Sequence, residues 1–276
     1  MIEAIQSVQH FVNGEKEIIV VDNDSQDGTE KEIRFKFPDV QFIQSGSNLG
    51  FSKANNLGFV QSTGSEILLL NPDAKLINSA ITDALNFLKQ NPKTILGPKI
   101  LNPDGTHQES VLNSPGVISV ITESLFLSYL IKPKPYLENI SLLGACLLMS
   151  RNVYESLSGL DENLFWMEDV DLCHRARQAG IKVHYYKAWE IVHESGQSIK
   201  SNYKISIANQ LLSKLKFIRK HNTRFAFYVS LLFIQLHILF RLILFLILSP
   251  FKQAYIHKFF AYCYSQNMLI KYIFNP

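Results

Sequence analysis

Cysteine is scarce in this sequence. Only three cysteines, Cys146, Cys173 and Cys263, occur among the 276 residues, and no two of them form a C-x-x-C pair. An odd number of widely spaced cysteines argues against a disulfide framework and against a thiolate zinc site. We therefore expect reduced thiols, as in a protein that faces the cytosol.

An excess of charge of one sign is also missing. The formal net charge is +3, from 27 Lys and Arg against 24 Asp and Glu, and the first two hundred residues hold no concentrated basic stripe. Because nucleic-acid binding needs such a stripe, we expect no nucleic-acid partner. The opening residues MIEAIQSVQH have neither a basic segment nor an apolar run, so we expect no signal peptide.

Two familiar ligand-binding motifs do not occur. No G-x-G-x-x-G follows an expected strand, which argues against a Rossmann-type oxidoreductase. The acidic stretch VVDNDSQDGT (20–29) also fails as an EF-hand calcium loop, which needs Gly at its sixth position and Glu at its twelfth. Whether the count starts at Asp22 or at Asn23, the twelfth residue is not Glu. We therefore exclude a calcium loop.

Short apolar runs alternate with amphipathic segments in the first part of the chain. The continuous apolar runs are typical of strands buried on both faces of a parallel sheet. This alternation predicts an α/β fold with a mostly parallel central sheet. The expected strands are 17–21, 40–43, 66–70 and 95–101, and the expected helices are 2–12, 31–37, 52–61 and 78–90.

Acidic turns follow two of the expected strands. Asp22 ends the run EIIVV, and Asp73 follows EILLL. Ligands of such sheets bind beyond the carboxyl ends of the strands, so we expect both residues in one crevice. A carboxylate at Asp73 suits Mg²⁺ or Mn²⁺, which proteins hold with one or two carboxylates plus substrate phosphates. We expect Ser25, Asp27 and Thr29 to build the turn and cap the next helix.

The chain changes character near residue 200. From Phe225 to Leu248 it is apolar over a length that can cross a bilayer, which takes about 20 residues. Gln235, His237 and Arg241 interrupt this stretch, and a charge at the centre of a span is costly. Three interpretations stay open: a single span, a helix in the membrane interface, and a buried helix of a soluble domain. Basic residues flank the stretch on both sides: Lys214, Lys216, Arg219, Lys220, Arg224, Lys252 and Lys258.

Four motifs, in order, resemble the family 2 glycosyltransferases, particularly the bacterial rhamnosyltransferase-like branch. They are VVDNDSQDGT (20–29), SNLGFSKANNLGF (47–59), LLLNPDA (68–74) and LLGACLLMSRNVYESLSGLDENLFWMEDVDLCHRARQAG (142–180). The resemblance implies a GT-A fold and an inverting sugar transfer from a nucleotide-diphosphate donor. We expect this domain over residues 1–200 and a membrane-associated tail of hydrophobic and amphipathic helices over 201–276.

The resemblance also implies roles for residues on the donor side. Asp22 would contact the base or ribose of the donor, and Asn48 and Gly50 would line the nucleotide pocket. Asn71 and Asp73 stand where the family has its D-x-D-like motif. Asp73 would bind a Mg²⁺ or Mn²⁺ ion that bridges the diphosphate, and Asn71 would contact the donor.

On the acceptor side the resemblance points to the segment WMED. Asp169 would be the general base that deprotonates the acceptor hydroxyl, and Glu168 is assigned to substrate binding. Glu168 and Asp169 open an expected helix, in which Leu172, Ala176 and Ala179 form an apolar stripe before Gly180 ends it. Acids at a helix N-terminus also occur for structural reasons alone. Trp166 is assigned to the acceptor sugar, with plain packing as the alternative. His193 occupies a position that in relatives can approach the metal or the diphosphate, with an ordinary polar loop residue as the alternative.

We therefore expect a glycosyltransferase at the cytoplasmic face of the cell membrane, either peripheral or with a single span. The donor would be a dTDP-, UDP- or GDP-sugar, with rhamnose as the best assignment, and the acceptor a cell-surface glycan or a lipid-linked sugar. The family opens with an apolar strand ahead of the helix expected here at 2–12. Without that strand, the run 17–21 would expose an unpaired edge. The alternative is an inactive GT-A remnant or a binding module.

Overall fold

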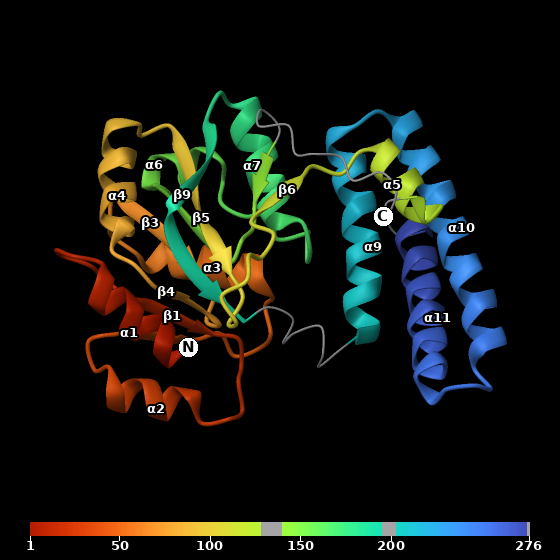
Figure 1. Cartoon of the computed structure of the whole chain (residues 1–276), viewed down its shortest axis with the longest axis horizontal. Coiled ribbons are helices and arrows are strands. Elements are labelled where there is room, and N and C mark those ends of the chain that lie inside the picture. Colours follow the sequence, from red (N-terminus) through yellow and green to blue (C-terminus); the bar gives the residue numbers. More distant parts are fainter. Residues whose placement is uncertain (128–139, 195–202, 275–276) are drawn as a thin grey trace. The chain divides into compact units, whose positions relative to one another are not determined.

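The computed structural model describes residues 1–127, 140–194 and 203–274, which form two compact units. The first unit is α/β and comprises Met1–Ser114, Pro135–Asn163 and Glu168–Ser195. The second is helical and comprises Pro115–Lys134, Leu164–Met167 and Gly196–Pro276 (Figure 1). The domain boundary expected at 200/201 lies in 195–202, outside the described residues. The helical unit also includes Pro115–Lys134 and Leu164–Met167, which the sequence analysis assigned to the domain over residues 1–200.

The eight elements expected between residues 2 and 101 are all present in the α/β unit. Further along, the helix expected to open at Glu168 is also found. The elements are α1 (Ile2–Phe11), β1 (Ile19–Asp22), α2 (Thr29–Lys36), β2 (Gln41–Gln44), α3 (Phe51–Gln61), β3 (Glu66–Leu70), α4 (Ala80–Gln90), β5 (Thr94–Leu101) and α7 (Glu168–Gln178). Six elements were not expected: β4 (Ala74–Leu76), β6 (Val111–Asn113), β7 (Ile140–Leu142), β8 (Cys146–Ser150), α6 (Arg151–Ser156) and β9 (Lys182–His193).

The central sheet has five strands in the order β3-β8-β5-β9-β4. Among its neighbouring pairs only β5 and β9 are parallel, whereas β8 is antiparallel to both β3 and β5, and β4 is antiparallel to β9. The α/β class is confirmed, but the expectation of a mostly parallel sheet is wrong for these five strands. The reason is that β8 and β4, which the sequence pattern did not reveal, insert against the direction of their neighbours.

Strands β1 and β2 form a separate parallel pair. The Glu17 carboxylate accepts hydrogen bonds from the backbone N–H groups of Thr63 (2.6 Å) and Gly64 (2.7 Å), so the start of β1 lies beside the residues that lead into β3. Even so, β1 and β3 are not hydrogen-bonded to each other as strands. Among the described strands, β1 therefore pairs on one edge only, as the sequence comparison with the family led us to expect.

Apolar side chains fill both faces of the five-stranded sheet. On one face α6 and α7 pack against the strands, and on the other face α4 does so. A third cluster joins α1 and α2 to β1 and β2. The first face buries Ile67, Leu69, Ile95, Leu147, Met149, Val153, Tyr154, Leu172 and Cys173, and the second buries Leu76, Ile81, Ala84, Leu88, Leu96, Ile100, Leu148, Trp189 and Ile191.

The helical unit contains α5 (Val117–Ser124), α9 (Tyr203–His221), α10 (Arg224–Leu248) and α11 (Gln253–Phe274). Helices α9, α10 and α11 contact one another, and α5 contacts α10 (Figure 1). Of the helices in the described part of the chain, α10 alone is long and apolar enough to cross a membrane. Its outer face exposes Phe225, Tyr228, Leu232, Leu236, Leu239, Phe240, Ile243, Leu246 and Ile247.

Candidate active site

Asp22 lies at the end of β1 with its side chain 2% exposed. Its Oδ2 accepts a hydrogen bond from the N–H of Ser25 at 2.9 Å, so it also closes the turn. The next residue, Asn23, accepts from the N–H of Leu49 (3.2 Å) and donates to the carbonyl of Gly50 (3.3 Å). Asn23 therefore ties the turn after β1 to the loop that precedes α3.

Asn48 and Gly50 shape that second loop. The Asn48 side chain is exposed and its Oδ1 accepts from the Gly50 N–H at 3.0 Å. Gly50 has φ +79°, a conformation that glycine adopts without steric cost, and α3 begins at the next residue. Asp27 accepts from both the N–H and the hydroxyl of Thr29, as its expected turn role requires.

The two residues predicted to bind metal, Asp73 and His193, lie side by side. Strand β4 pairs with β9 so that Ala74 is opposite His193. His193 Nε2 is 3.3 Å from Asp73 Oδ1, and the Asp73 carbonyl accepts from the N–H of Glu194 at 3.0 Å. A pairing of strands far apart in the sequence thus brings a carboxylate and an imidazole to one point.

The donor set around Asp73 fits a divalent cation. Asn71 Oδ1 is buried without a hydrogen-bond partner in the described structure, so an amide oxygen is also available nearby. No group of three or more His, Cys, Asp or Glu that could hold a metal occurs among residues 1–127, 140–194 and 203–274. A larger cluster is not needed for Mg²⁺, which proteins usually bind with one or two carboxylates while substrate phosphates supply further oxygen ligands.

Asp169 stands in the first turn of α7, half-buried, with both oxygens hydrogen-bonded. Oδ2 accepts from the N–H of Gly144 and Oδ1 from the N–H of Val170, each at 2.7 Å. Burial raises the pKa of Asp169, and these two donors oppose that rise. A carboxylate held in this way is oriented by the backbone, and the two N–H donors favour its charged form.

Glu168 differs from its neighbour in having a buried Oε2 with no partner in the described structure. Burial, reinforced by the charge of Asp169, raises the pKa of Glu168 to about 8. Two interacting carboxyl groups titrate as a pair. The N–H donors favour the negative charge on Asp169, whereas Oε2 of Glu168 has no such partner.

Gly144, in the turn between β7 and β8, connects the two halves of the site. Its N–H holds Asp169, and the carbonyl of the next residue, Ala145, accepts from the N–H of Asn71 at 2.9 Å. A Cβ at position 144 would lie 3.1 Å from Asp169 Cβ and 3.3 Å from its Oδ2. We did not predict Gly144 or Asn23 from the sequence, although a lone glycine between two apolar runs marks a close backbone approach.

Helix α7 is fixed by packing and by a buried ion pair. Leu172 and Ala176 are buried as predicted, whereas Ala179, expected on the same apolar stripe, lies beyond the helix end and is exposed. Arg175 donates to Asp171 (2.6 Å), whose side chain is fully buried, and to the carbonyls of Leu157 and Gly159. These contacts fix the orientation of the helix start that carries Asp169.

Trp166 belongs to the helical unit, where its N–H donates to the Ser213 hydroxyl of α9 at 3.2 Å. Its indole is half-buried, and its assignment to the acceptor sugar stays a prediction.

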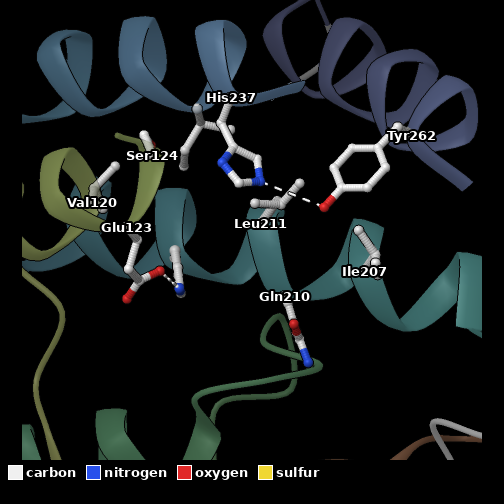
Figure 2. A pocket seen from close by; sticks show the side chains of 10 residues that line it. Val120, Glu123, Ser124, Ile207, Gln210, Leu211, His237 and Tyr262 are labelled. Atoms are coloured by element: carbon white, nitrogen blue, oxygen red, sulfur yellow. Dashed lines mark hydrogen bonds and ion pairs between the residues drawn. The ribbon is translucent and has the colours of Figure 1, made fainter. Parts of the chain in front are cut away.

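The helical unit also contains a cavity of about 140 Å³ (Figure 2). Figure 2 shows His237 and Tyr262 facing each other across it. The His237 Nε2 and the Tyr262 hydroxyl are 3.5 Å apart. Glu123 forms an ion pair with Lys214 at its rim. Because pockets for drug-sized ligands measure about 300–1,000 Å³, this cavity is too small for a nucleotide-sugar.

The family model described as glycosyl transferase family 2 matches residues 1–158, more than half of the chain. The chain belongs to this family. Its motifs at 20–29, 47–59 and 68–74 lie within the matched region, and the resemblance inferred from them is confirmed.

Two curated relatives are enzymes of glycan assembly. A low-salt glycan biosynthesis hexosyltransferase of Haloferax volcanii is 26% identical over 205 residues, covering 69% of this chain and 63% of that protein. An N-acetylglucosaminyl-diphospho-decaprenol L-rhamnosyltransferase of Mycobacterium tuberculosis is 28% identical over 206 residues, covering 66% and 67%. The chain thus spans about two thirds of the length of these relatives.

Solved structures show the same fold. A mannosyltransferase of Pyrobaculum calidifontis, in complex with GDP-Man and Mn²⁺, aligns with a TM-score of 0.58 at 13% identity, covering 98% of this chain and 81% of that one. A GalNAc-T7 structure with UDP, GalNAc and Mn²⁺ aligns with a TM-score of 0.53 at 13% identity, covering 74% and 44%. The GT-A fold expected from the sequence is confirmed.

Proposed function

We propose that this family 2 protein transfers a sugar, with inversion, from a nucleotide-diphosphate donor to a glycan or lipid-linked acceptor. The observation that carries the proposal is the link between Asn71 and Ala145. This hydrogen bond places the Asp73–His193 pair and the Asp169–Gly144 pair on adjacent turns of one sheet. A sugar transferase needs these two pairs close together, because Asp73 and His193 would serve the diphosphate leaving group and Asp169 the acceptor hydroxyl.

On the donor side, Asp22, Asn48 and Gly50 form the turns that receive the nucleotide. Asp73 and His193 would hold Mg²⁺ or Mn²⁺, with Asn71 beside them. When bound, a divalent ion neutralises the charge that develops on the diphosphate leaving group. Two comparison structures contain Mn²⁺ and a nucleotide or nucleotide-sugar, which supports this assignment at the level of the fold.

On the acceptor side, Asp169 takes the proton of the attacking hydroxyl. Its backbone hydrogen bonds orient the carboxylate, and its partial burial keeps it basic enough to accept a proton. Glu168, protonated beside it, keeps a second negative charge out of the site and can donate a hydrogen bond to the substrate. Trp166 serves the acceptor sugar in this proposal.

Rhamnose is our assignment for the sugar, supported by the mycobacterial relative, whose name describes a rhamnosyltransferase with a lipid-diphosphate acceptor. An inactive GT-A remnant is the second candidate. It is favoured by one observation, the edge of β1 that pairs with no described strand.

We further propose that the helical unit holds the enzyme at the cytoplasmic face of the membrane. The exposed apolar face of α10 and the basic residues that flank it support a membrane contact, whether as a span or in the interface.

Calorimetry on the full chain in detergent tests the function. We expect one of dTDP, UDP and GDP to bind, more tightly with Mn²⁺ than without it, and Asp73→Asn to remove the dependence on Mn²⁺. Asp39→Asn, at an exposed position outside the site, serves as the control. A folded chain that binds none of the three nucleotides would support the inactive-remnant alternative instead.

A further inference from the structure

A short loop after β5 lies against His193. The N–H of Asn102 donates to the carbonyl of Thr106 (2.8 Å), and the N–H of Gln108 donates to the carbonyl of Ile100 (2.9 Å). Gly105, with φ +81°, makes the turn. Backbone hydrogen bonds at both ends therefore fix the loop, and its polar side chains have defined partners.

The Asp104 carboxylate determines which side chain donates and which accepts in each hydrogen bond of this loop. Asp104 Oδ1 accepts from the hydroxyl of Thr106 (2.6 Å) and from its N–H (2.9 Å), which lowers the pKa of the Asp104 carboxyl. An ionised carboxylate can only accept. The Thr106 hydroxyl therefore gives its proton to Asp104, so it must accept from the Asn102 side chain, whose Nδ2 is 2.9 Å away.

The donors and acceptors from Asn102 to the His193 imidazole follow in turn. With its amide nitrogen turned to Thr106, Asn102 presents Oδ1 to Gln108, whose Nε2 donates to it at 3.3 Å. Gln108 then presents Oε1 to His193 Nδ1, at 3.0 Å. Since that amide oxygen can only accept, Nδ1 of His193 carries a proton.

In the tautomer whose single proton is on Nδ1, His193 has a lone pair on Nε2. That atom is 3.3 Å from Asp73 Oδ1, which is also an acceptor. In that tautomer the two atoms are both acceptors, and they repel each other unless a cation or a proton lies between them. The loop thus leaves Asp73 and His193 prepared for a positive ion.

We propose that Asp104, Thr106, Asn102 and Gln108 form a polarised hydrogen-bond relay that fixes the tautomer of His193 and presents its Nε2 to a divalent cation shared with Asp73. The inference rests on the proposed metal role of Asp73 and His193. The four residues are positioning residues: they set which imidazole nitrogen is free to bind, as partners of metal-binding histidines commonly do.

The tautomer can be measured without any metal. The full chain is labelled with ¹⁵N-histidine in detergent micelles, and long-range ¹H–¹⁵N spectra are recorded at mildly alkaline pH. The His193 signals are those that disappear in His193→Gln. We expect a protonated Nδ1 and an unprotonated Nε2 in the wild type, and a mixture of tautomers in Gln108→Leu. An Nε2-protonated or doubly protonated ring in the wild type would overturn the relay.

The affinity for Mn²⁺ alone, measured by electron paramagnetic resonance, tests the consequence. Loss of a partner of this kind costs about 10- to 100-fold in metal affinity, which we expect for Gln108→Leu. Gln108→Glu keeps an acceptor for Nδ1 and should bind like the wild type, and Thr106→Val should weaken binding by a smaller factor. Gln90→Leu, an exposed change at the end of α4, is the control.

Circular dichroism and thermal unfolding establish that each variant is folded. Equal Mn²⁺ affinity in the wild type and a folded Gln108→Leu would overturn the relay and leave the metal site intact. A folded wild type that binds no Mn²⁺ would instead overturn the metal role of Asp73 and His193, and the tautomer measurement would then decide the relay on its own.

Discussion

The carboxylate of Asp169 and the backbone N–H of Gly144 are joined by a 2.7 Å hydrogen bond. At this point the two segments of the chain approach so closely that a Cβ on Gly144 would meet Asp169 at 3.1 Å. The proposed base is therefore oriented by a backbone group of another element. Its geometry depends on the absence of one side chain.

Gly144→Ala should reduce sugar transfer strongly while the protein stays folded. The added methyl forces the Asp169 side chain to shift by a few tenths of an ångström from its hydrogen bond. Since a misplacement of about 1 Å can cost 10²-fold in rate, we expect a loss of up to about that size. Steady-state kinetics with donor and acceptor measure the effect. Gly116→Ala is a matched control, because its Cβ would meet no atom within 4 Å and its φ of −131° suits alanine. Unchanged turnover in Gly144→Ala would argue against the proposed role of Asp169.

Asp169→Asn should abolish transfer and leave donor binding largely intact. The amide keeps the size of the side chain but cannot take a proton, and a general base contributes about 10²–10⁴-fold. Turnover and calorimetric donor binding are measured side by side. Equal turnover by the variant and the wild type would exclude Asp169 as the base.

Glu168→Gln should change how stability depends on pH. The pKa of Glu168 is about 8 in the folded protein, above its ordinary value of 4.5. Between these values the unfolded chain has lost the proton that the folded protein still binds, so the stabilising contribution falls as pH rises from about 4.5 to about 8.

Glutamine removes this pH-dependent loss of stability, because its side chain stays neutral at every pH. Above pH 8 the variant should therefore exceed the wild type by about 1 kcal/mol or more in the free energy of unfolding, and the difference should shrink toward pH 4.5. Denaturant unfolding at several pH values measures it. The exposed change Glu15→Gln should show no such trend, and a pH-independent difference for Glu168→Gln would contradict the raised pKa.

Arg175→Met should destabilise the α/β unit by about 3–5 kcal/mol, because it leaves the buried Asp171 carboxylate without its cation. Arg34→Met also breaks an ion pair, with Glu30, but both side chains are about half exposed. Such surface pairs contribute about 0–1 kcal/mol, so this variant is the control. Urea unfolding followed by circular dichroism compares the two, and equal losses would show that burial of the pair does not matter.

Replacing Leu232, Leu236 and Ile243 together by glutamine should weaken membrane association. All three side chains lie on the exposed face of α10, and burying each in lipid contributes about 1.5–3 kcal/mol. Flotation of the full chain with vesicles that contain anionic lipid measures the bound fraction. Phe35→Gln, which removes an exposed apolar side chain of α2 in the α/β unit, should leave it unchanged. If both variants float equally, α10 is not the membrane contact.

Much of the α/β unit could be predicted from the sequence because its elements carry local signals. All eight segments expected between residues 2 and 101 formed, since continuous apolar runs and helical periodicity depend on residues close in the chain. The strand-end positions of Asp22 and Asp73 followed from the same runs. The strand β4 escaped prediction because three residues are too few for a periodic signal, and β8 because it continues the apolar run LLGACLLMS, in which only Gly144 marks a possible strand start.

What the sequence by itself determined, then, is where strands and helices form, which polar residues stand at strand ends, and which family the motifs resemble. Only the tertiary structure decided that β9 pairs with β4 and so brings His193 to Asp73, and that Gly144 reaches the start of α7. It also decided that Gln108 faces His193. Backbone hydrogen bonds between strands are nearly the same for every residue type. Strand order and register are therefore set by the packing of both sheet faces, which no local stretch of sequence contains.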